Sequence, residues 1–498
     1  MAVERQESSY RLEPLDTTGV FLGLGPVQCG LLGAGITIAV LALTAGLPLP
    51  VGAVPLLGAV TVSFANVRGH PAWEWLPLAA CWFWATLRRG RRWVAPLPLL
   101  PTDEAKPPPL PPCLAGLEVI EVPWHGPLHL AAVRDRERQT LTALVPVRGP
   151  QFVLEPRGEQ ERLLAGWGDV FAQFAVEGGP VTHLFWSDLA CPSAPESHVA
   201  SLDDEPRSDR PSSERDSYQE LLDLAAASAT THETVVGITV ARNRTLQRQS
   251  GSVGGVDPLQ RALTTAVDGL VRGLQSAGVT VDDPLDTIGL HRLIRRRVDP
   301  LAGAARPRRQ RRLTDRLGLV TPASSGPLVV DTAWRHVRVD AAWHRTWWIA
   351  CWPRLAVPPS WLEPFLSSSG VARTMTVALL PVPARQSRRR IERDLVKFDS
   401  DAATKEDKGR RIDARHHRAT QALLDREAEL VAGYAEMAYV GLVSVAAHSE
   451  DQLDEHSEIV DHFARQAGME LRLLDGRQDL AWAAALPLGL APKTLVGS

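Results

Sequence analysis

Cysteine is scarce in this sequence, and its few copies are scattered. The 498 residues include five cysteines, and no two of them form a C-x-x-C pair. Zinc sites and redox-active dithiols need closely spaced thiols, and a disulfide framework needs an even set in an oxidising compartment. The pattern therefore argues against both, and it predicts a reducing environment for most of the chain. The cysteines are Cys29, Cys81, Cys113, Cys191 and Cys351.

Motifs that bind nucleotides or activate a nucleophile are also absent. No G-x-x-x-x-G-K-[ST] string occurs, so the phosphate-binding loop of a secretion ATPase is missing. Residues 23–25 (GLG) lack the third glycine of a dinucleotide-binding loop. A nucleophile elbow (G-x-S-x-G) has a glycine two residues before its serine and another two residues after it. Ser252 is followed by Gly254 but preceded by Ser250, so this stretch is interpreted as a flexible linker. We therefore expect no catalytic residue and no cofactor, and we interpret the chain as a non-enzymatic protein.

The histidines lack the spacing of metal ligands. His416 and His417 are adjacent, so on a helix their side chains point about 100° apart and cannot share a metal ion. His232 has no second histidine four residues on, and a glycine and a proline separate His125 from His129. Surface positions or hydrogen-bonded core positions account for these side chains. The sequence predicts no metal site.

A long stretch near the N-terminus lacks charge altogether, because no charged residue lies between Thr17 and Val67. A single membrane span needs about 20 apolar residues, so this stretch accommodates two spans, near 27–45 and 51–65. Two prolines in residues 46–50 (GLPLP) favour a tight turn between them. The alternative is a buried helical hairpin in the core of a soluble protein. A cleaved signal peptide is disfavoured because acidic residues precede the apolar stretch and no basic region leads into it.

An aromatic and basic segment follows the apolar stretch. Tryptophan prefers the headgroup layer of a bilayer, and arginine marks the cytoplasmic side of a membrane protein. Glu74 and Pro77 argue against a third span and favour a helix that lies along the membrane surface. Two spans return the chain to its starting side, so we expect both termini in the cytoplasm. The predicted membrane-interface residues are Trp73, Trp75, Trp82, Arg88, Arg89, Arg91, Arg92 and Trp93.

The remaining chain shows mixed helix and strand patterns, which predict an α+β cytosolic region with mixed or antiparallel sheets. Apolar runs at 117–122, 129–133 and 140–147 predict a small antiparallel sheet. No internal repeat of fixed period is apparent. The predicted organisation is a membrane hairpin with its interfacial segment (1–94), a Pro-rich linker (95–112), a first subdomain (113–325), and a second subdomain (326–498) with a charged helical arm (388–439).

Arginine is concentrated in one part of the chain, although the formal net charge is only −3. A basic cluster of this density can contact an acidic partner protein, anionic lipid or nucleic acid, or it can be a solvated loop. Nucleic acid is the weaker functional option, since aromatic residues for base stacking are not interleaved. The candidate partner-contact residues are Arg295, Arg296, Arg297, Arg306, Arg308, Arg309, Arg311 and Arg312.

A second basic run opens the charged arm. Arg388, Arg389, Arg390 and Arg393 alternate there with Glu392 and with further acidic residues downstream. Opposite charges at helical spacing favour an exposed helix held by salt bridges.

Six short strings are distributed through almost the whole chain. They are residues 10–15 (YRLEPL), 73–77 (WEWLP), 160–168 (QERLLAGWG), 352–354 (WPR), 474–478 (LDGRQ) and 485–489 (ALPLG). In this order the strings resemble an actinobacterial family of conjugation and secretion membrane proteins.

The resemblance implies a function in a translocation machine. The N-terminal hairpin resembles the PrgI-type membrane subunit of conjugation systems, and the soluble part resembles the N-terminal region of VirB-type secretion ATPases, without their motor domain. An EccE-type component of type VII secretion is a related possibility. The resemblance thus implies an oligomeric membrane adaptor that docks a separate motor ATPase. The rival hypotheses are a membrane-tethered enzyme with an unrecognised site and a membrane-bound DNA-binding factor.

Overall fold

The computed structural model describes the chain in segments. They are residues 26–46, 48–67, 70–88, 90–96, 109–150, 152–192, 229–243, 257–301, 326–353, 357–407, 414–431 and 435–490, with a few isolated residues between 217 and 246.

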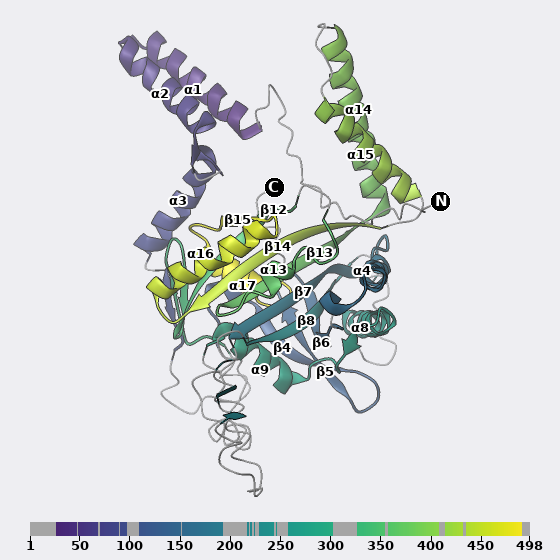
Figure 1. The fold of residues 1–498 in the computed structure, drawn as a ribbon. Helices are drawn as coiled ribbons and strands as arrows, with labels where there is room; N and C mark the ends of the chain where they lie inside the picture. Colours follow the sequence, from purple (N-terminus) through teal and green to yellow (C-terminus); the bar gives the residue numbers. More distant parts are fainter. Residues whose placement is uncertain are drawn as a thin grey trace, which may run out of the picture.

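The described N-terminal part is a series of apolar helices that stands apart from the body of the protein (Figure 1). Gly46, at φ 80°, lies in the turn after the first helix, where a left-handed conformation suits glycine. The next two helices each contain an internal proline, Pro55 and Pro77. The elements are α1 (Pro26–Thr44), α2 (Leu49–Phe64), β1 (Asn66–Val67), β2 (His70–Pro71) and α3 (Ala72–Leu87).

The body is built on a 13-stranded sheet whose described pairings are all antiparallel. Its order is β3-β10-β11-β12-β14-β13-β7-β8-β6-β5-β4, with β15 beside β12 and β9 beside β6. The strands are β3 (Arg92–Val94), β4 (Leu117–Pro123), β5 (His129–Asp135), β6 (Thr140–Arg148), β7 (Val181–Pro192), β8 (Thr230–Ala241), β9 (Thr280–Val281), β10 (Val329–Thr332), β11 (Val337–Val339), β12 (Ala342–Cys351), β13 (Ala372–Val382), β14 (Glu436–Ala447) and β15 (Glu470–Leu473).

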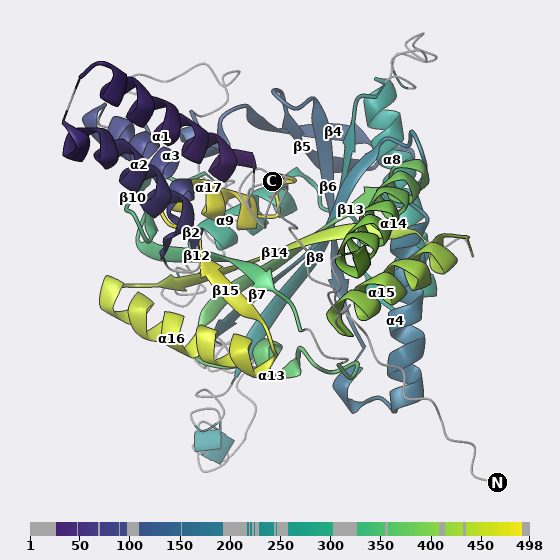
Figure 2. The same cartoon turned by 90° about the horizontal axis from the view of Figure 1, so that it is seen from above.

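Helices cover both faces of this sheet, and one helical pair projects away from it (Figures 1 and 2). Short 3-10 turns precede β4 and α4. The elements are η1 (Pro112–Leu114), η2 (Phe152–Leu154), α4 (Arg157–Ala172), α8 (Pro258–Ser276), α9 (Thr287–Val298), α13 (Glu363–Leu366), α14 (Ala384–Asp407), α15 (Ala414–Val431), α16 (Glu450–Gln466) and α17 (Gln478–Ala485).

The described strands form two units with the same order and pairing. Each unit has a three-strand meander, two long paired strands, a helix, a short strand and a further helix: β4–β6, β7, β8, α8, β9 and α9 in one, β10–β12, β13, β14, α16, β15 and α17 in the other. In both units the second long strand and the short strand pair with the last strand of the meander. The units meet where β7 pairs with β13. The repeated topology is a finding that the sequence did not predict.

The two units also share a helix ending. Gly278 follows α8 and Gly468 follows α16, at φ 82° and 76°. After each glycine, the next amide donates to a carbonyl five residues earlier, at 3.0 Å in the first unit and 2.8 Å in the second. This is the Schellman arrangement, which needs a left-handed residue that glycine adopts without steric cost. An Ala-Gly pair therefore ends each helix and directs the chain into the short strand that follows.

The core lies on both faces of the sheet. On one face, α8 packs against β6 and β8 with fully buried Leu263 and Leu270, and α16 packs against β12 and β14 in the second unit. Trp186 contacts both of these clusters, so the two helices share a face. On the opposite face, α9 packs against β4 and β5 and α17 packs against β12 and β14, and Trp482 of α17 is 1% exposed. Burial of apolar surface on both faces is what stabilises the sheet.

The α+β prediction is confirmed, since the sheet is large and antiparallel and helices pack on it. The three predicted strands of residues 117–147 are β4, β5 and β6, within a much larger sheet. The predicted subdomains 113–325 and 326–498 both contribute strands to that sheet, and the position of a boundary between them stays a prediction. The predicted arm corresponds to α14 and α15, which lie side by side and project from the body (Figure 1).

Candidate membrane-contact and partner surfaces

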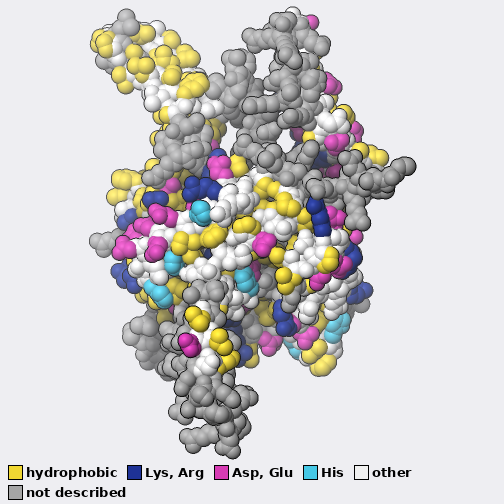
Figure 3. Space-filling model, viewed as in Figure 1, with side chains coloured by type: hydrophobic (Ala, Val, Ile, Leu, Met, Phe, Trp, Pro, Cys, Tyr) yellow, Lys and Arg dark blue, Asp and Glu magenta, His cyan; other side chains and the backbone are white. Residues whose placement is uncertain are grey.

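Helix α1 carries its large apolar side chains on the outside. The window Val27–Thr44 has 18 residues and a mean hydropathy of 1.9, and only 11% of it is buried. Ile36 and Ile38 are each 52% exposed, and Leu41 is 61% exposed. Figure 3 shows hydrophobic side chains gathered over these N-terminal helices. By length and composition α1 can cross a membrane.

Helix α2 lies against α1 and is also apolar, with 16 residues. The side-chain amide of Gln28 donates to the backbone carbonyl of Ser63 at 2.8 Å. This hydrogen bond joins the start of α1 to the end of α2. At Gly35 a Cβ would lie 2.5 Å from the Cβ of Ala59, so the two backbones approach closely there. Small residues at such contacts are typical of helix packing in membranes. The outer surface of α2 exposes Val54 and Leu57.

One side of α3 is attached to the body through tryptophans. The ring of Trp334, in the connection between β10 and β11, stacks on Trp75 with centroids 6.2 Å apart and meets Trp82 edge-on at 5.3 Å. The guanidinium of Arg91 lies 4.9 Å from the ring centroid of Trp82. Two of the predicted interface tryptophans therefore fix α3 to the protein, at least on this side.

The other side of α3 is exposed and apolar. Leu76, Phe83, Trp84 and Leu87 are each more than half exposed, and Arg88 lies over the ring of Trp84 at 5.4 Å. An apolar face rimmed by arginine is typical of a helix that lies in a membrane interface. If α3 contacts lipid, this is the face that does so, rather than the one with Trp75.

The remaining predicted interface residues lie in different environments. Trp73 is half-buried in α3, and Trp93 lies in β3, where it packs against the core. Arg92 is exposed at the start of β3. Arg89 lies outside the described residues.

The three described arginines of the predicted partner surface make internal contacts. Arg295 donates to Asp340 at 2.7 Å, and Arg296 donates to Glu233 at 2.6 Å. Arg297 is 2% exposed. These contacts attach the end of α9 to the body. The other five, Arg306, Arg308, Arg309, Arg311 and Arg312, lie outside the described residues.

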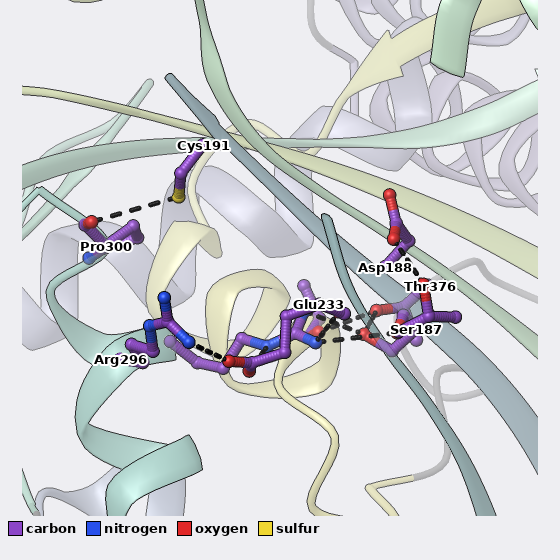
Figure 4. Close-up of polar contacts among 10 residues, drawn as sticks. Ser187, Asp188, Cys191, Glu233, Arg296, Pro300 and Thr376 are labelled. Atoms are coloured by element: carbon purple, nitrogen blue, oxygen red, sulfur yellow. Dashed lines mark hydrogen bonds and ion pairs between the residues drawn. The ribbon is translucent and has the colours of Figure 1, made fainter. Parts of the chain in front are cut away.

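A buried polar junction lies between the two units around Ser187 and Thr376 (Figure 4), and Arg297 is hydrogen-bonded into it. Its guanidinium donates to the hydroxyl of Ser187 at 3.2 Å and to the carbonyl of Glu233 at 2.8 Å. Ser187 bonds in turn to the hydroxyl of Thr376 at 2.9 Å, and Thr376 donates to the carbonyl of Ala485 at 2.8 Å. The network thus connects α9, the two central strands and α17.

Burial sets the charge state of groups around the junction. Desolvation lowers the pKa of Arg297, and the carboxylates of Glu233 and Asp188 oppose that shift. The Cys191 thiol, 3.9 Å from the carbonyl of Pro300, has its pKa raised to about 11 by burial. A buried thiol with a raised pKa is a poor nucleophile, because the thiolate is the reactive form.

A small cavity adjoins the junction. Its volume is about 10 Å³, and Arg297, His344, Arg373, Thr374 and Trp482 are among the lining residues. Space of this size holds at most about one water molecule. Burial lowers the pKa of His344 to about 4, so this histidine is neutral near pH 7. The junction therefore suits a structural role and has no room for a substrate.

Some of the described arginines of the arm form ion pairs with residues of the body. Within the described residues, Arg390 lies 3.7 Å from Glu436, and Arg385 lies 3.2 Å from Glu177. Arg388, Arg389 and Arg393 form no ion pair within the described part of the chain. The prediction of an exposed helix held by salt bridges therefore stays a prediction for the arm as a whole.

Two comparisons of the sequence with known proteins found no match. No protein-family model matches the chain, and no curated protein matches its sequence. The resemblance to conjugation and secretion proteins accordingly stays a prediction. Among the described residues no group of three His, Cys, Asp or Glu side chains is placed to hold a metal ion.

Proposed function

We propose that this chain is a membrane-anchored, non-catalytic component of a conjugation-type or type VII-like secretion apparatus. In this proposal α1 and α2 form a two-span hairpin in the cytoplasmic membrane. The sheet body lies in the cytoplasm and docks a separate motor ATPase or further copies of the chain.

The exposed apolar surface of α1 and α2 is the observation that carries the proposal. Transfer of each such side chain to the bilayer core favours insertion by about 0.3–0.6 kcal/mol, so a set of about ten contributes roughly 3–6 kcal/mol. In water the same set is an unusually large apolar patch. The side chains are Val27, Ile36, Ile38, Val40, Leu41, Leu43, Val54, Leu57, Val60 and Phe64.

The arrangement of the helices favours a hairpin over a single span. The hydrogen bond between Gln28 and Ser63 brings the start of α1 beside the end of α2, so the chain enters and leaves on one side. Arg88, Arg91 and Arg92 follow on that side, and the positive-inside rule places it in the cytoplasm. Helix α2 is shorter than a typical span, and local thinning of the bilayer or flanking residues can accommodate it.

The assignment to a secretion or conjugation apparatus rests on the sequence resemblance. The body supports it indirectly, since a wide sheet with a projecting helical arm offers extended surface for partner proteins.

Two measurements on native membranes test the proposal. We expect the full chain to stay in the membrane pellet after alkaline carbonate extraction, and to co-purify after cross-linking with a hexameric ATPase from the same cells. Release into the carbonate supernatant would contradict the anchor. Recovery of a clean monomer after cross-linking would contradict the adaptor function while leaving the anchor intact.

A further inference from the structure

The two edges of the sheet differ in what covers them. In the second unit the first strand of the meander, β10, is paired on its outer side with β3, which follows α3 in the chain. The corresponding strand of the first unit, β4, ends the sheet, and within the described part of the chain no strand pairs with its outer side. One edge therefore has its backbone groups covered, and the other leaves them open to pairing.

The hydrogen bonds of β4 identify the open groups. The carbonyl of Gly116, directly before β4, accepts from the amide of Arg136 at 3.0 Å, on the side of β5. Pairing of β4 with β5 has no register shift. Successive residues of an antiparallel strand point their backbone groups to opposite sides, so the odd-numbered residues of β4 face away from β5. The amides of Leu117, Val119 and Glu121 therefore point outward from the sheet. We refer to these three as the edge amides.

Strand β4 has few of the features that keep an edge strand from pairing. It has seven residues and no bulge. Its carboxylates are bound within the chain, since Glu118 pairs with Arg134 at 3.1 Å and Glu121 accepts from the hydroxyl of Thr287 at 3.0 Å. Its proline, Pro123, is the last residue of the strand. An edge of this kind is a template for an added strand.

Strand β3 shows the chemistry of a strand that fits the corresponding edge. Arg92 lies opposite Asp331 of β10, and Trp93 packs against the core beneath α9 and α17. The edge of β4 offers the same two features. Val119 is half-buried against that core, and Glu121 is an exposed carboxylate. A strand with a large apolar side chain and a neighbouring basic one therefore suits this edge.

The open edge lies away from the proposed anchor. In the strand order β4 is at the opposite end from β3, the strand that follows α3. In Figure 1, β4 lies on the body away from α1 and α2. Beside it the start of α9 exposes Ile288, which is 53% exposed and follows the Thr287 that binds Glu121. With α1 and α2 in the membrane, this edge and its apolar neighbour face the cytoplasm.

We infer that the outer edge of β4 binds an extended segment of the cytoplasmic partner protein, which pairs with it as an added antiparallel strand, as β3 does with β10. The segment carries a large apolar side chain over Val119 and a basic side chain near Glu121. This inference rests on the proposed function, in which the partner is a motor ATPase, and it names the surface that the partner meets.

Hydrogen exchange tests the inference on the full chain, alone and in the complex that co-purifies with the ATPase from detergent-solubilised membranes. We expect the edge amides to exchange freely in the chain alone and at least about tenfold more slowly in the complex. The amides of Glu118, Ile120 and Val122 face β5 and should exchange slowly in both samples. This alternation along one strand is specific to strand addition.

A pair of variants at one position tests the same contact. Glu121→Pro removes an edge amide, and proline is tolerated at an outward position of an edge strand. Loss of one backbone hydrogen bond, with a partner carbonyl left unpaired, should reduce the ATPase recovered per chain at least about fivefold. Glu121→Gln keeps the amide and should retain most of the recovery. Thermal unfolding shows whether both bodies are folded, and exchange of the unmodified complex decides the matter if Glu121→Pro is not.

The outcomes separate the two proposals. Recovery of the ATPase with edge amides that exchange equally in the free and bound chain would overturn the inference and leave the adaptor function standing. Equal recovery by folded Glu121→Pro and Glu121→Gln would do the same. Slow exchange of the edge amides in the chain alone would show that this chain or a second copy already covers the edge, and would also overturn the inference. Absence of any ATPase from the purified chain would overturn both.

Discussion

The N-terminal helices and the sheet body contain the same apolar residue types in opposite environments. Ile36, near the middle of α1, is 52% exposed, whereas Ile238 in β8 is fully buried. The central strands of the body bury their apolar side chains under helices of the same chain, on both faces of the sheet. Helices α1 and α2 bury little beyond their contact with each other.

This difference shows which part of the molecule buries its apolar side chains within the chain and which part leaves them exposed. The described body buries most of its large apolar side chains within the chain. In α1 and α2, helix formation pairs the backbone hydrogen-bonding groups, but many apolar side chains remain exposed. This pattern suits a lipid environment. Substitutions should therefore act on folding in one region and on membrane attachment in the other.

The largest contrast should come from placing a charge at matched isoleucines. Ile238→Asp buries a carboxylate without a partner in the core, which costs several kcal/mol, and we expect the body to unfold. Ile36→Asp should leave the melting temperature of the body unchanged but weaken insertion of α1 by about 2.5–3.5 kcal/mol. Circular dichroism melts and carbonate extraction measure the two effects. Unfolding of the body by Ile36→Asp would show that α1 is part of its core.

A second contrast lies within the body, between adjacent arginines. Arg297→Ala removes a fully buried cation, leaves Ser187 without its donor, and should destabilise the fold by about 3–5 kcal/mol. Arg296→Ala removes an ion pair whose arginine is 50% exposed, and should cost less than about 1 kcal/mol. Chemical denaturation of both variants distinguishes them. Equal losses of unfolding free energy in the two variants would show that burial does not set the contribution of Arg297 to stability.

Acid should weaken the body through His344. Its pKa in the folded chain is about 4, below the usual 6.5, because it is buried. As the pH falls below 6.5 the unfolded chain takes up this proton first, so stability falls between pH 6.5 and 4, by about 1–3 kcal/mol. His344→Gln keeps a donor for the Val298 carbonyl and should have a flatter profile in denaturation measurements. An unchanged profile would mean that His344 titrates normally.

The smallest effect concerns the contact between α1 and α2. Gly35→Val would place a side chain against Ala59 and should weaken helix pairing by about 1–2 kcal/mol. Gly33→Val is the matched control, since nothing lies within 4 Å of a Cβ at Gly33. Cross-linking between Cys pairs placed on α1 and α2 in native membranes would report the pairing. Similar yields for both variants would argue that the helices separate in the bilayer.

Local patterns in the sequence predicted the elements whose signal is local. The lack of charge from Thr17 to Val67 located α1 and α2, and short apolar runs located β4 to β6. The charge-rich run after residue 388 indicated the arm, although α14 starts earlier, at Ala384.

Features that depend on distant contacts were not predictable in this way. In the sequence Arg297 belongs to a basic run, which predicts a surface residue. In the structure α9 places it under the central strands, where it donates hydrogen bonds to Ser187 and Glu233. The repeated topology is defined by which strands pair and not by which residues they contain. In the sequence its only sign that we identify is the Ala-Gly pair at the end of α8 and of α16.

The most direct test of the anchor is the side of the membrane that each region occupies. Native cysteines are replaced by serine, and single cysteines are introduced by Pro48→Cys between α1 and α2 and by Gln386→Cys at the base of the arm. A membrane-impermeant maleimide should label Cys at position 48 in intact cells, and label position 386 only after permeabilisation. Labelling of position 386 from outside, or of both positions only after permeabilisation, would contradict the two-span hairpin.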